Sequence, residues 1–188
     1  MTGGAAQDGA GLIGLDWGTS NLRVLRIAPG GAVLAARTDP RGAGGLSPDD
    51  FPKVLSDVAG DWLGQGLPVL ACGMAGARGR WRETPYLDIP ASLADLAAGL
   101  TSPPDRPDVR IVPGLKTLSH GRMTDVMRGE ETQGMGLDLE PGGHRIVAPG
   151  THSKWIEAGP GRVLGHRTFV TGELFSAIRR GSIVGEGM

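Results

Sequence analysis

The sequence predicts an α/β protein with mixed sheets, arranged as a first lobe over residues 11–142 and the start of a second lobe over 143–188. One reason is that short apolar segments with strand character alternate with stretches of helical periodicity. The other is a repeated structural order: a strand, a tight turn of glycine and hydroxyl residues and a meander open the chain and restart at His144. This duplication predicts two related lobes with a cleft between them. The second lobe has only about 45 residues, too few for a stable domain of its own.

The first lobe should contain three strands joined by tight turns, a helix, a buried parallel strand, a long loop, a short helix and a last strand. In that order they are expected at 11–16, 21–28, 32–38, 49–63, 67–72, 73–90, 92–100 and 109–112. Because the first two connections are so short, the first three strands should pair as an antiparallel meander. Ser47 or Asp49 is placed to cap the helix at 49–63.

A further helix is expected from Thr124 to about Leu139, although three glycines weaken it. The second lobe should then begin with a strand at 144–148 and a hairpin of 154–157 and 162–170, followed by a helix at 172–180. Thr171 is the expected N-cap of that last helix.

Composition excludes several classes of function. The chain has 188 residues, 39% of them hydrophobic, and a net charge of −1, so it has no basic footprint for nucleic acid. A single cysteine rules out a disulfide within the chain and a zinc site built from several cysteines. Residues 1–10 resemble a disordered lead rather than a signal peptide, and no apolar run approaches a membrane span. A cytoplasmic protein without nucleic-acid or membrane partners is expected, and homo-oligomerisation is left open.

The first candidate site is the turn that follows the first strand. Gly18 would let the backbone approach a phosphate, and Thr19, Ser20 and Asn21 can donate hydrogen bonds to it. Asp16, at the end of the strand, could orient a water bound to Mg²⁺. The alternative is an ordinary hairpin, since the same residue types are common in turns.

The second candidate site is the corresponding turn of the second lobe, where Gly150 and Thr151 repeat the same ingredients. Lys154 could act as a point charge for a phosphate, or equally be a solvated strand residue. Turns of this kind are often purely structural, but two of them at the starts of two lobes favour a shared function.

The third candidate site lies at the expected start of the helix at 124–139. Phosphoryl transfer to a hydroxyl needs a carboxylate that holds the oxygen and accepts its proton, and Asp125 could fill that role or simply cap the helix. Arg128, one helical turn further, could orient Asp125 or bind a substrate carboxylate. Glu130 and Glu131 either form a solvated face or present one carboxylate to the cleft.

The fourth candidate site is the loop at 73–90. Its arginines and aromatic residues, among them Arg78 and Trp81 near Gly76, suit an anionic, hydroxylated small molecule. A solvent-exposed basic loop is the alternative.

Taken together, the segments 14–23, 73–76, 125–133, 149–155 and 170–174 resemble the 2-dehydro-3-deoxygalactonokinase family of the actin/hexokinase/Hsp70-like ATPase superfamily. The resemblance runs in order from about Leu12 to Gly187, and the strings D-V-M-R-G-E-E-T-Q and P-G-T-H-x-K-W are its most specific parts. It implies an actin-like (ribonuclease H-like) fold.

The resemblance also implies a function: ATP- and Mg²⁺-dependent phosphorylation of the sugar acid 2-dehydro-3-deoxy-D-galactonate at its 6-hydroxyl, in galactonate catabolism. It assigns Asp16, Gly18 and Thr19 to the first phosphate motif, Gly150 and Thr151 to the second, and Asp125 to the catalytic base. Members of the family run longer, so an incomplete second lobe with little kinase activity by itself is expected.

Other functions have less support in the sequence. A non-catalytic fragment of the same fold, which binds a sugar acid or a partner, is the main alternative. A nicotinamide oxidoreductase is disfavoured because no G-x-G-x-x-G follows the first strand, and a ribokinase-type enzyme because no G-A-G-D string occurs.

Overall fold

The computed structural model describes residues 9–119, 122–183 and 185, and their contacts divide the chain into two compact units. Unit 1 comprises the chain up to Pro85 together with Gly99–Pro113, and unit 2 comprises Tyr86–Ala98 and the chain from Gly114 onward. The lobe boundary at residue 142 stays a prediction about the family fold, and the lead expected at 1–10 falls almost wholly outside the described residues.

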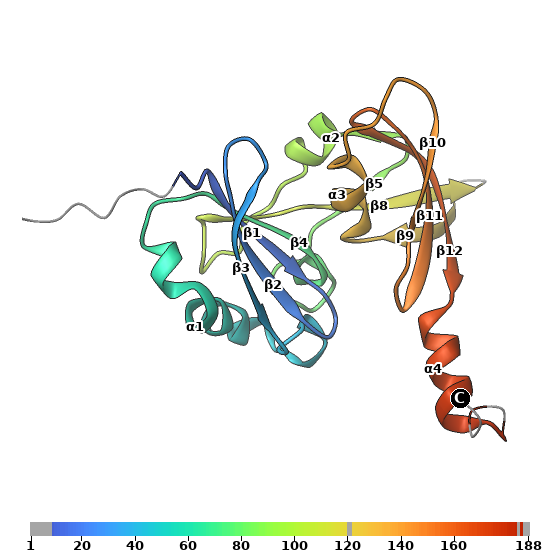
Figure 1. Ribbon diagram of the computed structural model, residues 1–188, viewed down its shortest axis with the longest axis horizontal. Helices are drawn as coiled ribbons and strands as arrows, with labels where there is room; N and C mark the ends of the chain where they lie inside the picture. Colours follow the sequence, from blue (N-terminus) through green and yellow to red (C-terminus); the bar gives the residue numbers. More distant parts are fainter. Residues whose placement is uncertain (1–8, 120–121, 184, 186–188) are drawn as a thin grey trace, which may run out of the picture. The chain divides into compact units, whose positions relative to one another are not determined.

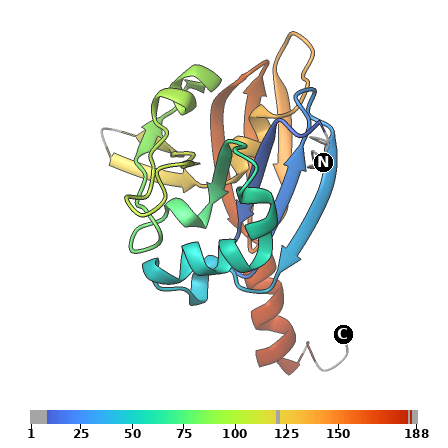
Figure 2. The same ribbon diagram turned by 90° about the vertical axis from the view of Figure 1, so that its left-hand side faces the viewer.

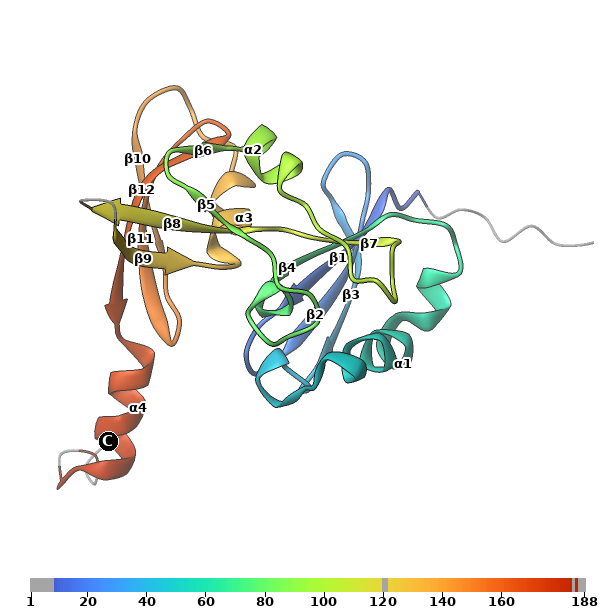
Figure 3. The same ribbon diagram turned by 180° about the vertical axis from the view of Figure 1, so that it is seen from behind.

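Unit 1 is built on a five-stranded mixed sheet with the order β3-β2-β1-β4-β7 (Figures 1 and 3). Its strands are β1 (Leu12–Trp17), β2 (Leu22–Ile27), β3 (Val33–Asp39), β4 (Val69–Gly73) and β7 (Val109–Ile111). The first three form the predicted antiparallel meander, and β4 is parallel to both β1 and β7, as its continuous apolar run predicted. Short 3₁₀ turns lie at Ala43–Gly45, Pro48–Asp50 and Met74–Gly76.

The helix α1 (Phe51–Leu63) lies beside this sheet (Figure 2), and its buried apolar residues belong to the same core cluster as those of the sheet. The 3₁₀ turn Pro48–Asp50 leads into α1 and begins with a capping box in which Ser47 and Asp50 bond reciprocally. Ser47 therefore caps this turn, whereas the residue before α1 itself is Asp50. Three aromatic rings form the centre of the core: Phe51 lies 4.7 Å from Trp17 and 5.6 Å from Trp81, centroid to centroid.

Unit 2 contains two sheets, with the orders β10-β11-β12-β6 and β5-β8-β9. The first consists of β10 (His144–Ala148), β11 (His152–Gly159), β12 (Arg162–Val170) and β6 (Ala91–Ser92). The second consists of β5 (Tyr86–Asp88), β8 (Gly114–Ser119) and β9 (Arg122–Met127). The helices are α2 (Leu93–Ala98), α3 (Glu130–Met135) and α4 (Gly172–Gly181).

The predicted duplication is confirmed at the level of the strands. β10, β11 and β12 form an antiparallel meander, as β1, β2 and β3 do, and in each meander the candidate turn joins the first two strands. The α/β class with mixed sheets is therefore confirmed.

The helix predicted from Thr124 to Leu139 is wrong over its first part. Residues 122–127 form β9, which pairs antiparallel with β8, and α3 spans only Glu130–Met135. The helix cannot extend backward because Gly129 has a φ of 111°, a left-handed conformation that interrupts it.

Candidate functional site

The first candidate turn lies on a rigid support. Trp17, the last residue of β1, is fully buried in the aromatic core, and its indole Nε1 donates a hydrogen bond of 3.2 Å to Arg41 O. Gly18, Thr19, Ser20 and Asn21 follow it, and all four are partly or fully exposed. Gly18 N donates to Asn21 O at 2.9 Å, which closes the turn. The turn is thus an exposed loop that directly follows the buried residue Trp17.

A second segment holds this turn from outside. Ala43 N donates to Gly18 O at 2.9 Å, and Gly44 N donates to Thr19 O at 2.8 Å. Gly42 passes so close that a Cβ there would lie within 2.3 Å of Thr19 O and of the Ser20 carbonyl carbon. Only glycine allows this approach, so the glycine-rich loop after β3 supports the candidate turn.

Asp16 is the candidate metal residue, at the carboxyl end of β1. Its Oδ2 accepts a hydrogen bond of 2.9 Å from Arg23, and its side chain is a quarter exposed. Among the described residues, no group of three or more His, Cys, Asp or Glu side chains could hold a metal ion. One accessible carboxylate suits Mg²⁺ that is carried mainly by phosphates and water, so the residues present fit a nucleotide-bound ion rather than a metal held by the protein alone.

The second candidate turn is constructed in a similar way. Gly150 and Thr151 are exposed between β10 and β11. Gly172 N donates to Gly150 O at 3.2 Å, and Glu173 N donates to Thr151 O at 3.0 Å. A Cβ on Gly172 would lie 2.5 Å from Gly150 O, so glycine is again required where the supporting segment meets the turn.

Thr171 occupies the N-cap of α4, as predicted, but its side chain makes no capping bond. Its Oγ1 instead lies 3.3 Å from Gly150 O and 2.6 Å from Ser153 Oγ. Thr171 therefore also ties the helix to the turn.

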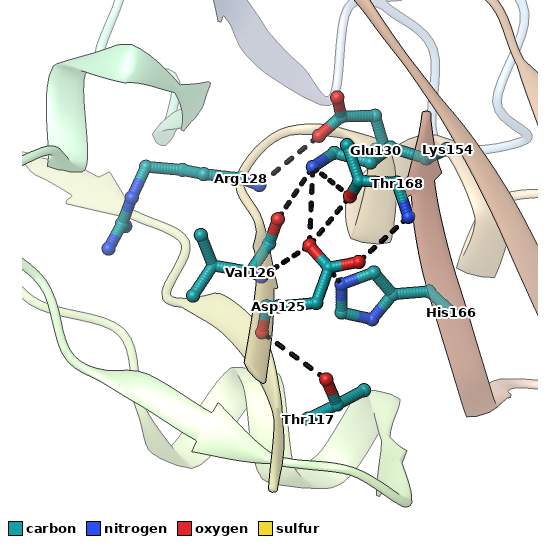
Figure 4. Close-up of polar contacts among 8 residues, drawn as sticks. All are labelled: Thr117, Asp125, Val126, Arg128, Glu130, Lys154, His166 and Thr168. Atoms are coloured by element: carbon teal, nitrogen blue, oxygen red, sulfur yellow. Dashed lines mark hydrogen bonds and ion pairs between the residues drawn. The ribbon is translucent and has the colours of Figure 1, made fainter. Parts of the chain in front are cut away.

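Asp125 lies on β9, not at a helix start, so the capping alternative is wrong. Its Oδ1 accepts hydrogen bonds from Thr168 Oγ1 at 2.6 Å and from Val126 N at 2.8 Å, and its Oδ2 accepts one from Thr168 N at 2.7 Å (Figure 4). Through this carboxylate, β9 is joined to β12, 43 residues further along the chain. The Asp125 side chain is 24% exposed and borders an open hollow of about 470 Å³. That hollow is lined by Thr117, Asp125, His166, Arg167, Thr168 and Phe169.

Lys154 differs from both expectations, since it is neither solvated nor open to a phosphate. Its Nζ donates to Val126 O at 2.6 Å and to Thr168 Oγ1 at 2.7 Å, and it lies 4.0 Å from Asp125 Oδ1 (Figure 4). Only 10% of its side chain is exposed. Its position on β11 places its side chain on the inner side of the sheet, where it contacts the residues around Asp125.

His166, which sequence reasoning missed, completes this cluster. Its Nε2 lies 3.5 Å from Asp125 Oδ1, too far for a good hydrogen bond, and its side chain is fully buried. Burial lowers the pKa of His166 although Asp125 opposes this, so the ring is mainly neutral at neutral pH. Burial would raise the pKa of Asp125, but Thr168, His166 and Lys154 together outweigh it and hold that pKa below its ordinary value. Asp125 is therefore ionised at neutral pH.

Arg128 does not orient Asp125. Its guanidinium lies over the Tyr86 ring, 4.3 Å from the centroid, and its side chain points away from Asp125 (Figure 4). The expected helical spacing between Asp125 and Arg128 is absent because β9 separates them by an extended backbone. Glu130 Oε2 accepts a hydrogen bond of 3.1 Å from Arg128 N, so Glu130 stabilises the start of α3 from a half-buried position.

Glu131 is not part of a solvated face. It is fully buried, with Oε2 accepting a hydrogen bond of 2.7 Å from Gly129 N and Oε1 one of 3.0 Å from Thr132 Oγ1. Burial raises the pKa of Glu131 to about 7; the bonds from Gly129 and Thr132 oppose this shift, and the charge of Glu130 adds to it.

Two of the three loop residues expected to bind substrate lie in the core of unit 1. Trp81 is 6% exposed, stacks on Phe51, and points its Nε1 at the carboxylate of Asp105, 3.3 Å away. Gly76 is buried, and its carbonyl accepts hydrogen bonds from Thr84 N and Oγ1. Arg78 is exposed and stays a candidate. The aromatic and glycine residues of this loop were misassigned because packing and ligand binding use the same residue types.

The signal for Thr168 and His166 was weak. Both lie on the inner side of β12, and the sequence predicts them only as strand residues. Their alternation in the run Arg162–Val170 shows which side they occupy, but not that Asp125 meets them there.

Comparison with known proteins identifies the family. A model of the family described as 2-keto-3-deoxy-galactonokinase matches residues 16–188. A protein of Rhizobium meliloti named a probable 2-dehydro-3-deoxygalactonokinase is 44% identical over 90% of this chain. The 2-dehydro-3-deoxygalactonokinase of Escherichia coli is 36% identical over 94% of it. The chain spans 56% and 59%, respectively, of the length of these two relatives.

Comparison with solved structures supports the same family. A crystal structure of a Sinorhizobium meliloti protein assigned as 2-dehydro-3-deoxygalactonokinase superposes with a TM-score of 0.79 at 41% identity, covering 94% of this chain and 59% of that one. An Aquifex aeolicus member of the Ppx/GppA family, with a TM-score of 0.50 at 12% identity over 88% of this chain and 53% of that chain, shares the fold alone. The predicted actin-like ATPase fold is confirmed, and the chain belongs to the 2-keto-3-deoxy-galactonokinase family.

Proposed function

We propose that this chain serves the ATP- and Mg²⁺-dependent phosphorylation of 2-dehydro-3-deoxy-D-galactonate at its 6-hydroxyl, a step of galactonate catabolism. The observation that carries the proposal is the repeated meander whose first connection is, in each unit, an exposed turn containing glycine and threonine. The names of the relatives support the substrate. A cytoplasmic location stays part of the proposal, and the oligomeric state stays open.

The two turns are proposed to contact the phosphates of ATP through backbone N–H groups and hydroxyls. In the first turn the donors are Thr19, Ser20 and Asn21, whereas Gly18, whose N–H donates to Asn21 O, lets the backbone approach the phosphates. In the second turn the contacts come from Gly150 and Thr151. Asp16 would hold water on the Mg²⁺ ion, and the ion would neutralise the charge that develops on the transferred phosphoryl group. Because each turn has a buried anchor or a backbone support, little ordering is needed when the nucleotide binds.

Asp125 is proposed to hold the substrate hydroxyl and to accept its proton. Its lowered pKa keeps it ionised, and in phosphoryl transfer a carboxylate acts largely by orienting the acceptor oxygen. Its Oδ2 accepts one hydrogen bond from Thr168 N, and a carboxylate oxygen has a second lone pair for a hydroxyl. Lys154 would act through Asp125 as a positioning residue, since its ammonium group is bound to Val126 and Thr168.

The test measures ADP formation that depends on the sugar acid. It uses the 188-residue chain and the same chain extended at its C-terminus by the part of the Rhizobium meliloti relative that it does not match. Turnover is expected in the extended chain and little in the 188-residue chain. Asp125→Asn should lower kcat of the extended chain by roughly 10²–10⁴-fold. Asp138→Asn, the same substitution at an exposed position, should leave kcat unchanged.

Wild-type turnover by Asp125→Asn would remove Asp125 as the base. An extended, folded chain that forms no ADP with this sugar acid would remove the substrate assignment.

A non-catalytic role for the 188-residue chain, as a sugar-acid-binding or assembly fragment, is the second candidate. It is favoured by the chain spanning little more than half of its relatives' length. Calorimetry of the 188-residue chain with the sugar acid tests this role. Binding without turnover by this chain supports it, and no binding by a chain that is monomeric in solution contradicts it.

A further inference from the structure

An exposed pair of a histidine and a carboxylate lies directly beside the second turn. His152 is the first residue of β11, and its Nε2 lies 2.6 Å from Glu173 Oε2. The two side chains are 45% and 61% exposed, respectively, so the pair contributes little to the stability of the fold. Among the described residues, the other ring nitrogen, Nδ1, has no hydrogen-bond partner. The contact therefore fixes the ring and leaves one nitrogen accessible to a ligand.

This pair is an addition to the arrangement that the two turns share. At the same place in unit 1, the first residue of the second strand is Leu22, which is fully buried. The residue that supports the turn at its threonine is Gly44 in unit 1 and Glu173 in unit 2. Only Glu173 has a side chain, and that side chain bonds His152. A hairpin that only reverses the chain needs neither residue, so the pair indicates a role that belongs to the second turn alone.

His152 also lies on the face of the sheet that carries the residues around Asp125. Side chains alternate between the two faces of a strand, so His152 shares a face with Lys154, two residues further along β11. The register pairs these two residues with Val170 and Thr168 of β12. Lys154 donates to Thr168 Oγ1, which in turn donates to Asp125. Because two residues of a strand span about 7 Å, His152 lies one such step from these contacts in the direction of the turn.

The position of His152 matters because of what has to pass between the turn and Asp125. The proposed function places phosphates of ATP at the turn and the acceptor hydroxyl at Asp125. The transferred phosphoryl group lies between the leaving and the attacking oxygen, and its three other oxygens carry negative charge. An imidazolium has N–H groups on both nitrogens, so His152 can donate from Nε2 to Glu173 and from Nδ1 to a phosphoryl oxygen. Lys154 is less suited, because it is 10% exposed and bonded to its neighbours.

We propose that His152 is a catalytic residue that binds the terminal phosphoryl group of ATP through Nδ1, and that Glu173 is the positioning residue that holds its ring. The inference rests on the proposed function and adds to it the group that recognises the transferred phosphoryl. His152 keeps both of its protons during the transfer, because the proton of the sugar hydroxyl goes to Asp125. Since ADP lacks the terminal phosphoryl group, His152 should favour ATP over ADP.

The test measures the affinity of the 188-residue chain for MgATP and MgADP by calorimetry at about pH 6, where imidazole side chains readily bind a proton. His152→Leu should weaken ATP binding roughly tenfold or more and leave ADP binding nearly unchanged, because a hydrogen bond between charged groups is worth about that much. His152→Asn places its amide nitrogen near the position of Nδ1, and His152→Gln near that of Nε2. The Asn variant should therefore retain more affinity for ATP than the Gln variant.

His144→Leu is the control. His144 lies at the start of β10, at the other end of the strand from the turn, and its Nε2 is bonded to Glu140 O. This variant should bind both nucleotides as the wild type does. In nitrogen NMR spectra of the wild type, ATP should shift the Nδ1 signal of His152 and not the ring signals of His144.

The amide signals of Gly150 and Thr151 separate this proposal from the proposed function. If ATP shifts them but His152→Leu binds ATP as tightly as the wild type, or loses affinity for ATP and ADP equally, the role of His152 is overturned while the phosphate role of the turn stands. A Gln variant that retains as much ATP affinity as the Asn variant overturns the assignment of Nδ1. If ATP shifts neither amide, the phosphate assignment of the turn fails, and this proposal fails with it. Circular dichroism confirms that each variant is folded.

Discussion

The carboxyl group of Glu131 should lower the free energy of unfolding of this chain as pH rises. Its pKa is about 7 in the folded chain and 4.5 in the unfolded reference, because the side chain is fully buried. Below pH 4.5 both the folded and the unfolded state carry the proton, so the ionisation of Glu131 does not lower the free energy of unfolding. Between pH 4.5 and 7 the unfolded state loses the proton first, so the free energy of unfolding falls, and above pH 7 the loss is complete.

The size of the effect follows from the shift. A difference of about 2.5 pKa units corresponds to about 3 kcal/mol at full extent, since each unit is worth about 1.4 kcal/mol. Glu131→Gln removes the ionisation and can keep both local contacts, because the amide oxygen can still accept from Gly129 N and the amide nitrogen can donate to Thr132 Oγ1.

The assay is urea unfolding of the wild type and of Glu131→Gln at a series of pH values from 4.5 to 8.5. The variant should gain stability relative to the wild type as pH rises, by about 3 kcal/mol across the range. Glu83→Gln is the control, because Glu83 is exposed. Parallel profiles for the wild type and Glu131→Gln would refute the reasoning and would mean that water or a conformational change relieves the burial of Glu131.

Three further predictions concern the two turns and the cluster around Asp125. Gly42→Ala should lower the free energy of unfolding by roughly 1–3 kcal/mol, because its Cβ would meet Thr19 and Ser20 at 2.3 Å. Gly45→Ala, which meets open space, is the control, and equal urea midpoints for the two would contradict the close approach. Gly172→Ala should destabilise the second turn for the same reason, with its Cβ 2.5 Å from Gly150 O, whereas Gly181→Ala should not; hydrogen exchange at the amides of residues 172 and 173, which donate to the turn, reports the difference. Lys154→Met should lower the free energy of unfolding by about 1–3 kcal/mol, since Val126 O and Thr168 Oγ1 lose a buried donor. Lys53→Met, at an exposed position, should change the free energy of unfolding little. Similar decreases in the free energy of unfolding for the two variants would argue against a structural role for Lys154.

Local patterns predicted the features of the fold that depend on neighbouring residues. The meander of β1–β3, the parallel strand β4, the strand β10, the hairpin of β11 and β12 and the helix α4 all lie within a few residues of their expected positions. Turn glycines and alternating apolar residues are read from the sequence because they act over two to eight residues.

The hairpin of β8 and β9 shows where this reading fails. The acidic and glycine residues after Thr124 predict a helix, but the alternation from Leu115 onward and Gly121 between the two segments are hairpin signals. Gly121 itself lies outside the described residues. One wrong assignment of periodicity moved Asp125 to a helix start and placed Arg128 beside it.

The contacts of the candidate site were predictable only in part. The turn residues could be named because turn chemistry is local. The Asp125 cluster could not, because it joins β9 to β11 and β12: Lys154 lies 28 residues from Val126, and Thr168 lies 43 residues from Asp125. Which residues meet across such separations depends on the register of two sheets, and a single sequence does not contain that information in readable form.

The duplication extends from the turns to their supports, and this bears on the proposed function. Gly18 and Thr19 are held through their carbonyl oxygens by the N–H groups of Ala43 and Gly44. Gly150 and Thr151 are held in the same way, by Gly172 and Glu173. Because the supports pair the carbonyl oxygens of both turns, these acceptors are less able to repel an anion bound at the turns. Two hairpins that needed only to reverse the chain would not both require a later glycine packed against them. The repeated support therefore favours a shared ligand chemistry for the two turns. It predicts that Gly42→Ala and Gly172→Ala will each reduce the free energy of nucleotide binding in the extended chain by more than they reduce its free energy of unfolding.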